Sequence, residues 1–147
     1  MKTYTPLQDK QIIVFVGDDY EDMELQYPKY RLIEAGASVT VAGLESGTRH
    51  LGKHGYPQAS QAAVKDLNPE DLDAVVIPGG WMPDKLRRAD EVKQLVSAMD
   101  AAGKCVASIC HGGWICASAQ VVSGRNYTGS PGIQDDRFIH GHGSIRT

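Results

Sequence analysis

Four short apolar runs alternate with segments of helical spacing along this 147-residue chain, and that alternation limits the possible folds more than any other feature. The runs are continuous stretches of apolar residues, which is typical of strands buried on both faces of a parallel sheet. They span residues 11–16, 38–42, 74–77 and 104–109. Strands that alternate with helices form a sheet with helices on both faces. The sequence therefore predicts a three-layer α/β/α sandwich.

The segments between these runs carry helix and turn signals. Residues 21–35 have apolar side chains at roughly helical spacing and are followed by Gly36, a common helix terminator. Pro28 falls inside this segment and is expected to kink the helix or split it. Residues 45–66 contain glycines between short β-like pieces, which indicates a hairpin or an excursion from the sheet. Residues 91–102 are predicted as a longer helix with four inward side chains: Val92, Leu95, Val96 and Met99.

Charge and composition exclude several classes of partner. A formal net charge of -3 disfavours nucleic acid and anionic membrane surfaces. No apolar stretch approaches the roughly 20 residues that span a bilayer, and no signal-peptide core is present. The 3 cysteines are irregularly spaced, so no disulfide framework is expected. We expect a cytoplasmic protein that binds neither nucleic acid nor membrane.

Cys110 follows the last apolar run and precedes the small-residue segment 113–119. This pattern predicts a strand that turns sharply into a helix with a cysteine at the bend, a nucleophile elbow. The positive end of a helix favours the thiolate, which is the attacking form of cysteine, over the thiol. The alternative is a buried structural cysteine, the role we expect for Cys105 and Cys116.

The carboxyl ends of the other runs supply further candidates, because parallel strands direct these ends to one edge of the sheet. Gly79 and Gly80 lack a Cβ, so their N–H groups can approach a substrate oxyanion; a plain turn is the alternative. Glu24 lies one turn into the first helix, and in its protonated form it can donate a hydrogen bond to the Cys110 thiolate. The alternative is that acidic residues there simply suit the helix dipole. His111 is a candidate base, and its backbone N–H is a candidate oxyanion donor.

The remaining aromatic and histidine residues give weaker signals. Tyr20 and Trp81 follow strands and either line the site or pack against it. The histidines other than His111 show no metal-ligand spacing, so neither a metal nor a cofactor is expected. These histidines are His50, His54, His140 and His142.

Three motifs in fixed order carry a family resemblance. They are Glu-Asp-Met-Glu-Leu at 21–25, Pro-Gly-Gly-Trp-Met-Pro-Asp at 78–84 and Ala-Ser-Ile-Cys-His-Gly at 107–112. With them the chain resembles the ThiJ/PfpI superfamily, and more narrowly its PfpI branch, over residues 11–136. The resemblance implies a flavodoxin-like sandwich related to class I glutamine amidotransferases.

The resemblance also implies roles for individual residues. Cys110 takes the position of the family's nucleophile, and Glu24 that of the carboxyl group touching its sulfur. In PfpI-like oligomers an acidic residue of a neighbouring subunit completes the site beside the histidine, and Asp84 holds that position here. We therefore expect a homo-oligomer, a dimer or larger, with a site shared across the interface. A glutaminase would need a distal His-x-Glu pair, which does not follow Cys110.

The end of the chain departs from the family pattern. Relatives continue past the position of Asp136 with two more strands and a final helix, whereas residues 137–147 are polar and patternless. We expect a domain over residues 1–136 and an atypical tail over 137–147, with the C-terminal strands and helix missing. A truncation or frameshift near Asp136 is the hypothesis, and the gene's other reading frames test it. If none of them encodes a family-like ending, the hypothesis fails.

Two functions remain open on these residues, and a third reading is a degenerate paralogue without function. The first function is a cysteine-dependent stress-response enzyme whose thiolate attacks an acyl or reactive carbonyl group, as a peptidase, glyoxalase or deglycase. Its substrate would be a small carbonyl compound or a peptide. The alternative is a non-enzymatic redox sensor or holdase that uses the same cysteine.

Overall fold

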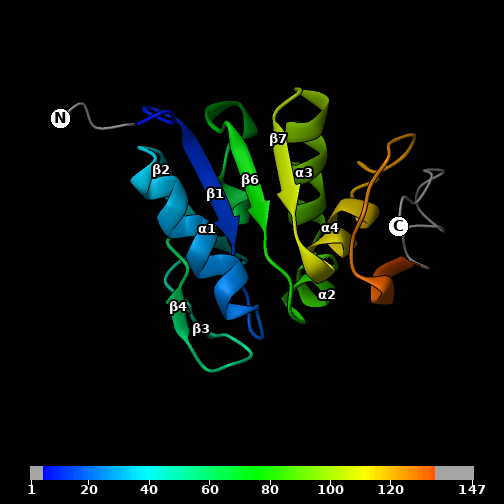
Figure 1. Cartoon of the computed structure of the whole chain (residues 1–147), viewed down its shortest axis with the longest axis horizontal. Helices are drawn as coiled ribbons and strands as arrows, with labels where there is room; N and C mark the ends of the chain where they lie inside the picture. The colour runs from blue at the N-terminus through cyan, green and yellow to red at the C-terminus, as the bar shows by residue number, and fades with distance from the viewer. Residues whose placement is uncertain (1–4, 135–147) are drawn as a thin grey trace.

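A five-stranded parallel sheet forms the centre of the fold (Figure 1). The computed structural model describes residues 5–134. The strands lie in the order β5-β2-β1-β6-β7. Their bounds are β1 (Gln11–Phe15), β2 (Ser38–Gly43), β5 (Ala62–Ala63), β6 (Ala74–Ile77) and β7 (Cys105–Ser108). All four predicted strands are confirmed, and their continuous apolar runs lie in the sheet.

Helices cover the two faces of this sheet. The helix α1 (Asp22–Glu34) lies on one face and α3 (Asp90–Ala101) on the other, which confirms the three-layer sandwich (Figure 1). The shorter helices are α2 (Met82–Leu86) and α4 (Gly113–Ser118), and the 3-10 turns are η1 (Val64–Asp66), η2 (Pro69–Asp71), η3 (Cys110–Gly112) and η4 (Pro131–Ile133). The inner face of α3 is buried as predicted, through Val92, Leu95, Val96 and Met99.

The helix α1 is continuous across Pro28, so the expected split is wrong. A proline inside a helix removes one backbone hydrogen bond, and the rest of α1 offsets that loss. At its start the Glu21 carboxylate accepts the Glu24 N–H at 2.8 Å. On its inner face Leu25 is fully buried in the core. Capping and packing therefore outweigh the helix-breaking tendency of one proline.

An antiparallel hairpin of β3 (Arg49–Leu51) and β4 (Pro57–Ala59) projects from the sheet, as predicted for residues 45–66. Asp22 fastens it to α1, because its buried carboxylate accepts the N–H groups of His54 and Tyr56 at 2.9 Å each. Burial alone would raise the pKa of Asp22, but these two hydrogen bonds hold that pKa below its ordinary value. Tyr20 packs in the core and donates its hydroxyl to the Tyr56 carbonyl at 2.6 Å.

The strand β7 is the edge of the sheet as far as residues 5–134 extend. Cys105 at its start is exposed, so the expectation that it packs in the core is wrong. An edge strand lacks the neighbour that would cover such a side chain. Cys116, in contrast, lies in the core as predicted. Beside β7 an apolar groove of about 340 Å³ runs between α1 and the β6–β7 part of the sheet, and Ile109 in it is half exposed.

The predicted boundary after Asp136 and the tail over 137–147 lie outside the described residues. Both stay proposals, together with the reading-frame hypothesis. Between residues 5 and 134, none of the helices combines the length and apolar character that a bilayer crossing requires.

Candidate active site

The predicted elbow is present between β7 and α4. Ile109 is extended, and Cys110, the first residue of η3, has a φ of 55°. A non-glycine residue in this left-handed region is strained, and such strain is concentrated at functional sites. A Cβ at Gly112 would lie 2.2 Å from the Ile77 carbonyl oxygen. Glycine therefore lets the turn close against β6, and the bend presents Cys110 at the carboxyl end of the sheet.

Gly79 is the point on which three segments converge. A Cβ at position 79 would lie 2.7 Å from Cys110 Cβ, 2.7 Å from Glu24 Oε2 and 3.0 Å from the backbone nitrogen of His111. The Gly79 N–H donates a hydrogen bond to Glu24 Oε2 at 2.7 Å. The structure thus brings together four residues singled out in the sequence, one from α1, one from the loop after β6 and two from the elbow.

Gly80 has a φ of 77° and fastens this loop to the residues that follow β1. A Cβ there would lie 2.3 Å from the Asp19 carbonyl oxygen, so a side chain is excluded. The Trp81 N–H donates a hydrogen bond to the Asp19 backbone carbonyl at 2.9 Å, and the Glu21 N–H donates one to the Gly79 backbone carbonyl at 3.1 Å. These bonds set the direction of the 79–81 peptide groups.

His111 lies in an aromatic cluster beside the elbow. Its Nδ1 is 3.2 Å from the Gly80 carbonyl oxygen. Its ring centroid lies 4.5 Å from that of Trp114 and 5.3 Å from that of Trp81. A Cβ at Gly132 would lie 3.3 Å from His111 Nε2, so the η4 turn closes on the far side of the ring. Of the two aromatic residues weighed in the sequence, Tyr20 packs in the core and Trp81 lies at the site, 59% exposed.

Asp84 lies on α2, and within the described residues its carboxylate is paired with two arginines of the same segment. Its carboxylate forms ion pairs with Arg87 at 3.1 Å and Arg88 at 2.5 Å. The guanidinium of Arg87 also lies 5.1 Å from the centre of the Trp114 ring. The action of Asp84 across a subunit interface therefore stays a proposal.

Two neighbours of His111 were missed in the sequence. Trp114 follows His111 by three residues, a spacing that puts both on one face of a helical turn, so this signal was available. Gly132 carried no such signal, since only the folded chain places η4 against the imidazole.

Within residues 5–134, one group of possible metal ligands lies near the start of α1. Oxygen or nitrogen atoms of Glu21, Asp22 and His54 come within 4.8 Å of one another. These carboxylates already have structural roles, since Glu21 caps α1 and Asp22 holds the hairpin. We therefore assign no metal to them.

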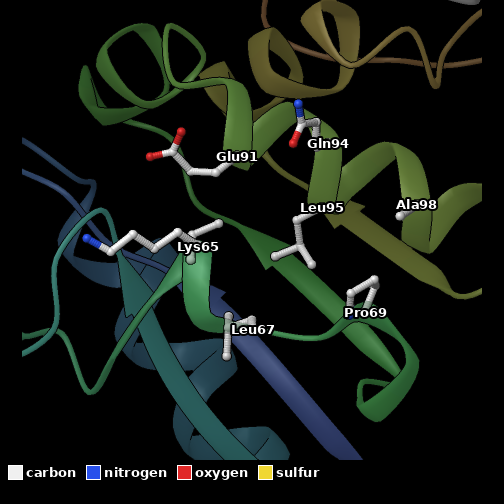
Figure 2. A pocket seen from close by; sticks show the side chains of 8 residues that line it. Lys65, Leu67, Pro69, Glu91, Gln94, Leu95 and Ala98 are labelled. Carbon is white, nitrogen blue, oxygen red and sulfur yellow. The ribbon is translucent and has the colours of Figure 1, made fainter.

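A separate cavity of about 230 Å³ lies between the η1–η2 segment and α3 (Figure 2). Its charged lining residues are Lys65 and Glu91, and Lys65 is paired with Glu45 at 3.2 Å. None of the candidate site residues at the carboxyl ends of the strands lines this cavity, so the cavity is not part of the candidate active site.

Comparisons with known proteins agree with this architecture. The chain is 42% identical over 131 residues to a deglycase of Pyrococcus abyssi, covering 89% of this chain and 78% of that protein. It is 40% identical over 131 residues to the deglycase PfpI of Pyrococcus furiosus, with the same coverage.

Among solved structures, a two-domain protein of Anabaena variabilis with DJ-1/ThiJ/PfpI-like and ferritin-like domains superposes with a TM-score of 0.89 at 30% identity. That match covers 93% of this chain and 39% of the two-domain protein. The family model described as DJ-1/PfpI matches residues 10–144. The chain therefore belongs to the DJ-1/PfpI family.

Proposed function

We propose that this protein is a cysteine-dependent enzyme whose Cys110 thiolate attacks a carbonyl or acyl carbon. The observation that carries the proposal is the meeting of Cys110, Glu24 and Gly79 around one point at a strained elbow. A nucleophile, a carboxyl group and close backbone amides are the parts that acyl and carbonyl chemistry needs. The names of the two Pyrococcus relatives support an enzyme.

The reaction begins with proton transfer from the Cys110 thiol to the Glu24 carboxylate. The Glu24 carboxylate accepts the Gly79 N–H through Oε2 and is the proton acceptor that we assign. The sulfur then forms a bond to the substrate carbon, and the carbonyl electron pair moves to oxygen. The N–H groups of Gly80 and His111 are the oxyanion donors we assign, because the Gly79 N–H already serves Glu24. Glu24 returns its proton to that oxygen, which completes a neutral adduct.

The substrate class is a small reactive carbonyl compound or a peptide. With methylglyoxal, the adduct is a hemithioacetal that rearranges by proton transfer between carbons to a thioester. Water then hydrolyses the thioester to lactate and restores the thiol. With a peptide, Glu24 gives the proton to the amine nitrogen instead of the oxyanion, the C–N bond breaks as the C=O bond re-forms, and the amine leaves. Water then hydrolyses the acyl-enzyme and restores the thiol.

The test compares wild type with Cys110→Ala in two assays, lactate formation from methylglyoxal and hydrolysis of a fluorogenic peptide. Cys105→Ser is the matched control, because Cys105 is a free cysteine on the sheet edge away from Glu24. We expect Cys110→Ala to fall to the uncatalysed background in at least one assay, and Cys105→Ser to keep the wild-type rate. Equal rates for wild type and Cys110→Ala in both assays overturn the proposal.

A further inference from the structure

Trp81 is an exposed aromatic residue at the candidate active site. It is 59% exposed, whereas the neighbouring Trp114 is 8% exposed. Tryptophan is highly buried on average, and a tryptophan that only packs the fold is expected to lie beneath the surface as Trp114 does. Single exposed apolar side chains also occur without a function, so the surroundings of Trp81 decide its role.

Contacts on one side hold the Trp81 indole in place. Its ring centroid lies 5.3 Å from that of His111, with an interplanar angle of 49°, and 6.3 Å from that of Trp114, with an angle of 31°. Its backbone N–H donates a hydrogen bond to the Asp19 carbonyl at 2.9 Å. A side chain that is already held in place loses little conformational entropy when a ligand packs against it. The exposed part of the indole is therefore a preformed apolar surface.

This surface adjoins the reacting groups. Trp81 directly follows Gly80, whose N–H is an oxyanion donor that we assign above. The His111 backbone nitrogen and the Cys110 Cβ would both lie within 3.0 Å of a Cβ at position 79, two residues before Trp81. A carbonyl group held by Cys110 and by these amides therefore lies in the same small region as the indole. The substituent beside that carbonyl is the part of a substrate that can contact Trp81.

The charges around Trp81 favour a neutral substituent. A cation is the other group that binds well to an indole face. However, the Asp19 carboxylate is already paired with Lys85 at 2.5 Å, and the Asp84 carboxylate is paired with two arginines. Three cationic side chains and two carboxylates thus follow or flank the indole, and the excess positive charge disfavours a further cation.

We propose that Trp81 is a specificity-determining residue, which packs against a neutral, planar, apolar substituent beside the reacting carbonyl. This inference rests on the function proposed above and narrows its substrate class. A 2-oxoaldehyde with an aryl group is preferred to one with a methyl group. Both carry the same aldehyde and ketone carbons, so the bonds that form and break at Cys110 are those described above. The product of the aryl compound is an aryl-substituted 2-hydroxy acid.

The first test measures kcat/KM from initial rates for phenylglyoxal, which gives mandelate, and for methylglyoxal, which gives lactate. We expect Trp81→Ala to lower kcat/KM about tenfold for phenylglyoxal, the size of one aromatic contact, and to leave that for methylglyoxal within about twofold. The loss should appear in KM. Trp81→Phe keeps an aromatic ring and should keep most of the preference.

Tyr30→Ala is the matched control for this test. Tyr30 is also an exposed aromatic residue, at 56%, but lies further along α1 than Glu24. Its loss should change neither rate. Equal losses for the two aldehydes in Trp81→Ala overturn the proposal, because a displaced His111 or a broken contact between subunits impairs both substrates alike. Light scattering on the same variant identifies the second case by a changed mass.

The second test measures binding without turnover. Saturation-transfer NMR is recorded for mandelate with Cys110→Ala and with the double variant Cys110→Ala/Trp81→Ala. We expect transfer to the phenyl protons of mandelate in the first protein and its loss in the second. Equal transfer in both proteins overturns the proposal.

The two proposals fail in different ways. If Cys110→Ala consumes both aldehydes at the wild-type rate, the proposed function fails, and the binding of mandelate still decides the contact with Trp81. If Cys110→Ala is inactive and Trp81→Ala loses the same activity toward both aldehydes, the specificity role of Trp81 alone fails.

Discussion

The Gly79 amide donates a 2.7 Å hydrogen bond to Glu24 Oε2, and this bond joins the loop after β6 to the first turn of α1. The same glycine lies against Cys110, since a Cβ at position 79 would come within 2.7 Å of the cysteine Cβ. The carboxyl group and the cysteine therefore share one neighbour that tolerates no side chain. The organisation of the site depends on that neighbour.

Gly79→Ala tests this dependence. The new methyl group would collide with the Cys110 Cβ and with Glu24 Oε2, so the loop must move. We expect kcat/KM to fall about 100-fold, because shifts of about 1 Å at a reacting centre cost that much. Gly47→Ala is the control: its Cβ meets nothing within 4 Å, although its φ of 76° makes alanine strained. The control should lose stability and keep activity, and wild-type activity in Gly79→Ala would contradict the proposed site.

Glu24→Gln separates the two roles of the carboxyl group. The amide oxygen of glutamine still accepts the Gly79 N–H, but the side chain cannot take a proton from Cys110. We expect kcat/KM to fall roughly 10²- to 10⁴-fold, the range for loss of a general base, with little change in the free energy of unfolding. Glu34→Gln, at the exposed end of the same helix, is the control. If both variants retain wild-type kcat/KM, Glu24 moves no proton.

Much of this fold could be predicted from the sequence, because continuous apolar runs and the inner face of α3 reflect local periodicity. The meeting of Glu24, Gly79 and Cys110 could also be expected, since parallel strands direct their carboxyl ends to one edge. Local sequence patterns gave wrong predictions where contacts between residues distant in the sequence determine the structure. Pro28 does not interrupt α1, because end capping and the burial of Leu25 outweigh one missing hydrogen bond. Cys105 is exposed because strand order, which no local pattern reveals, leaves β7 at the edge.

The partners of the site residues were harder to predict than the residues themselves. The Gly79 N–H was expected as an oxyanion donor, and in the structure it donates to Glu24. Whether a backbone amide is already occupied depends on angles that only the assembled loops define. The contact of Gly132 with His111 likewise joins segments about 20 residues apart through an irregular turn.

Asp22→Asn should destabilise the protein in a pH-dependent manner. The carboxylate accepts the N–H groups of His54 and Tyr56, and an amide can satisfy only one of them through its oxygen. At pH 7 we expect a loss of about 1–3 kcal/mol in the free energy of unfolding, measured with urea. Because the folded-state pKa of Asp22 is below its ordinary value of 3.8, the stabilisation is present above that value and is lost as pH falls through the folded-state pKa.

The difference between wild type and Asp22→Asn should therefore be constant from pH 7 to about pH 5 and shrink below pH 4. Asp71→Asn, on the exposed η2 turn, is the control and should match wild type throughout. A difference that grows on acidification would show that Asp22 is not held ionised by its hydrogen bonds.

Mixing subunits tests whether Asp84 acts on a neighbouring chain. Cys110→Ala and Asp84→Asn should each be inactive alone if both residues are needed. Unfolding and refolding them together gives mixed oligomers, in which one site combines an intact Cys110 with an intact Asp84 from the other chain. For random dimers about a quarter of wild-type activity should return. No recovery, in mixed oligomers verified by mass spectrometry, would confine Asp84 to its own chain.

The central claim is that Cys110 is the reactive thiolate of this chain, and competitive alkylation tests it most directly. The native protein is treated with limiting iodoacetamide, quenched at intervals and digested, and the modification of each cysteine is followed by mass spectrometry. Cys105 is exposed, Cys110 half-buried and Cys116 buried, so exposure alone would make Cys105 react first. We predict that Cys110 is modified fastest and that Glu24→Gln slows its modification, since the thiolate is the reacting form. Modification of Cys105 ahead of Cys110 would contradict the account.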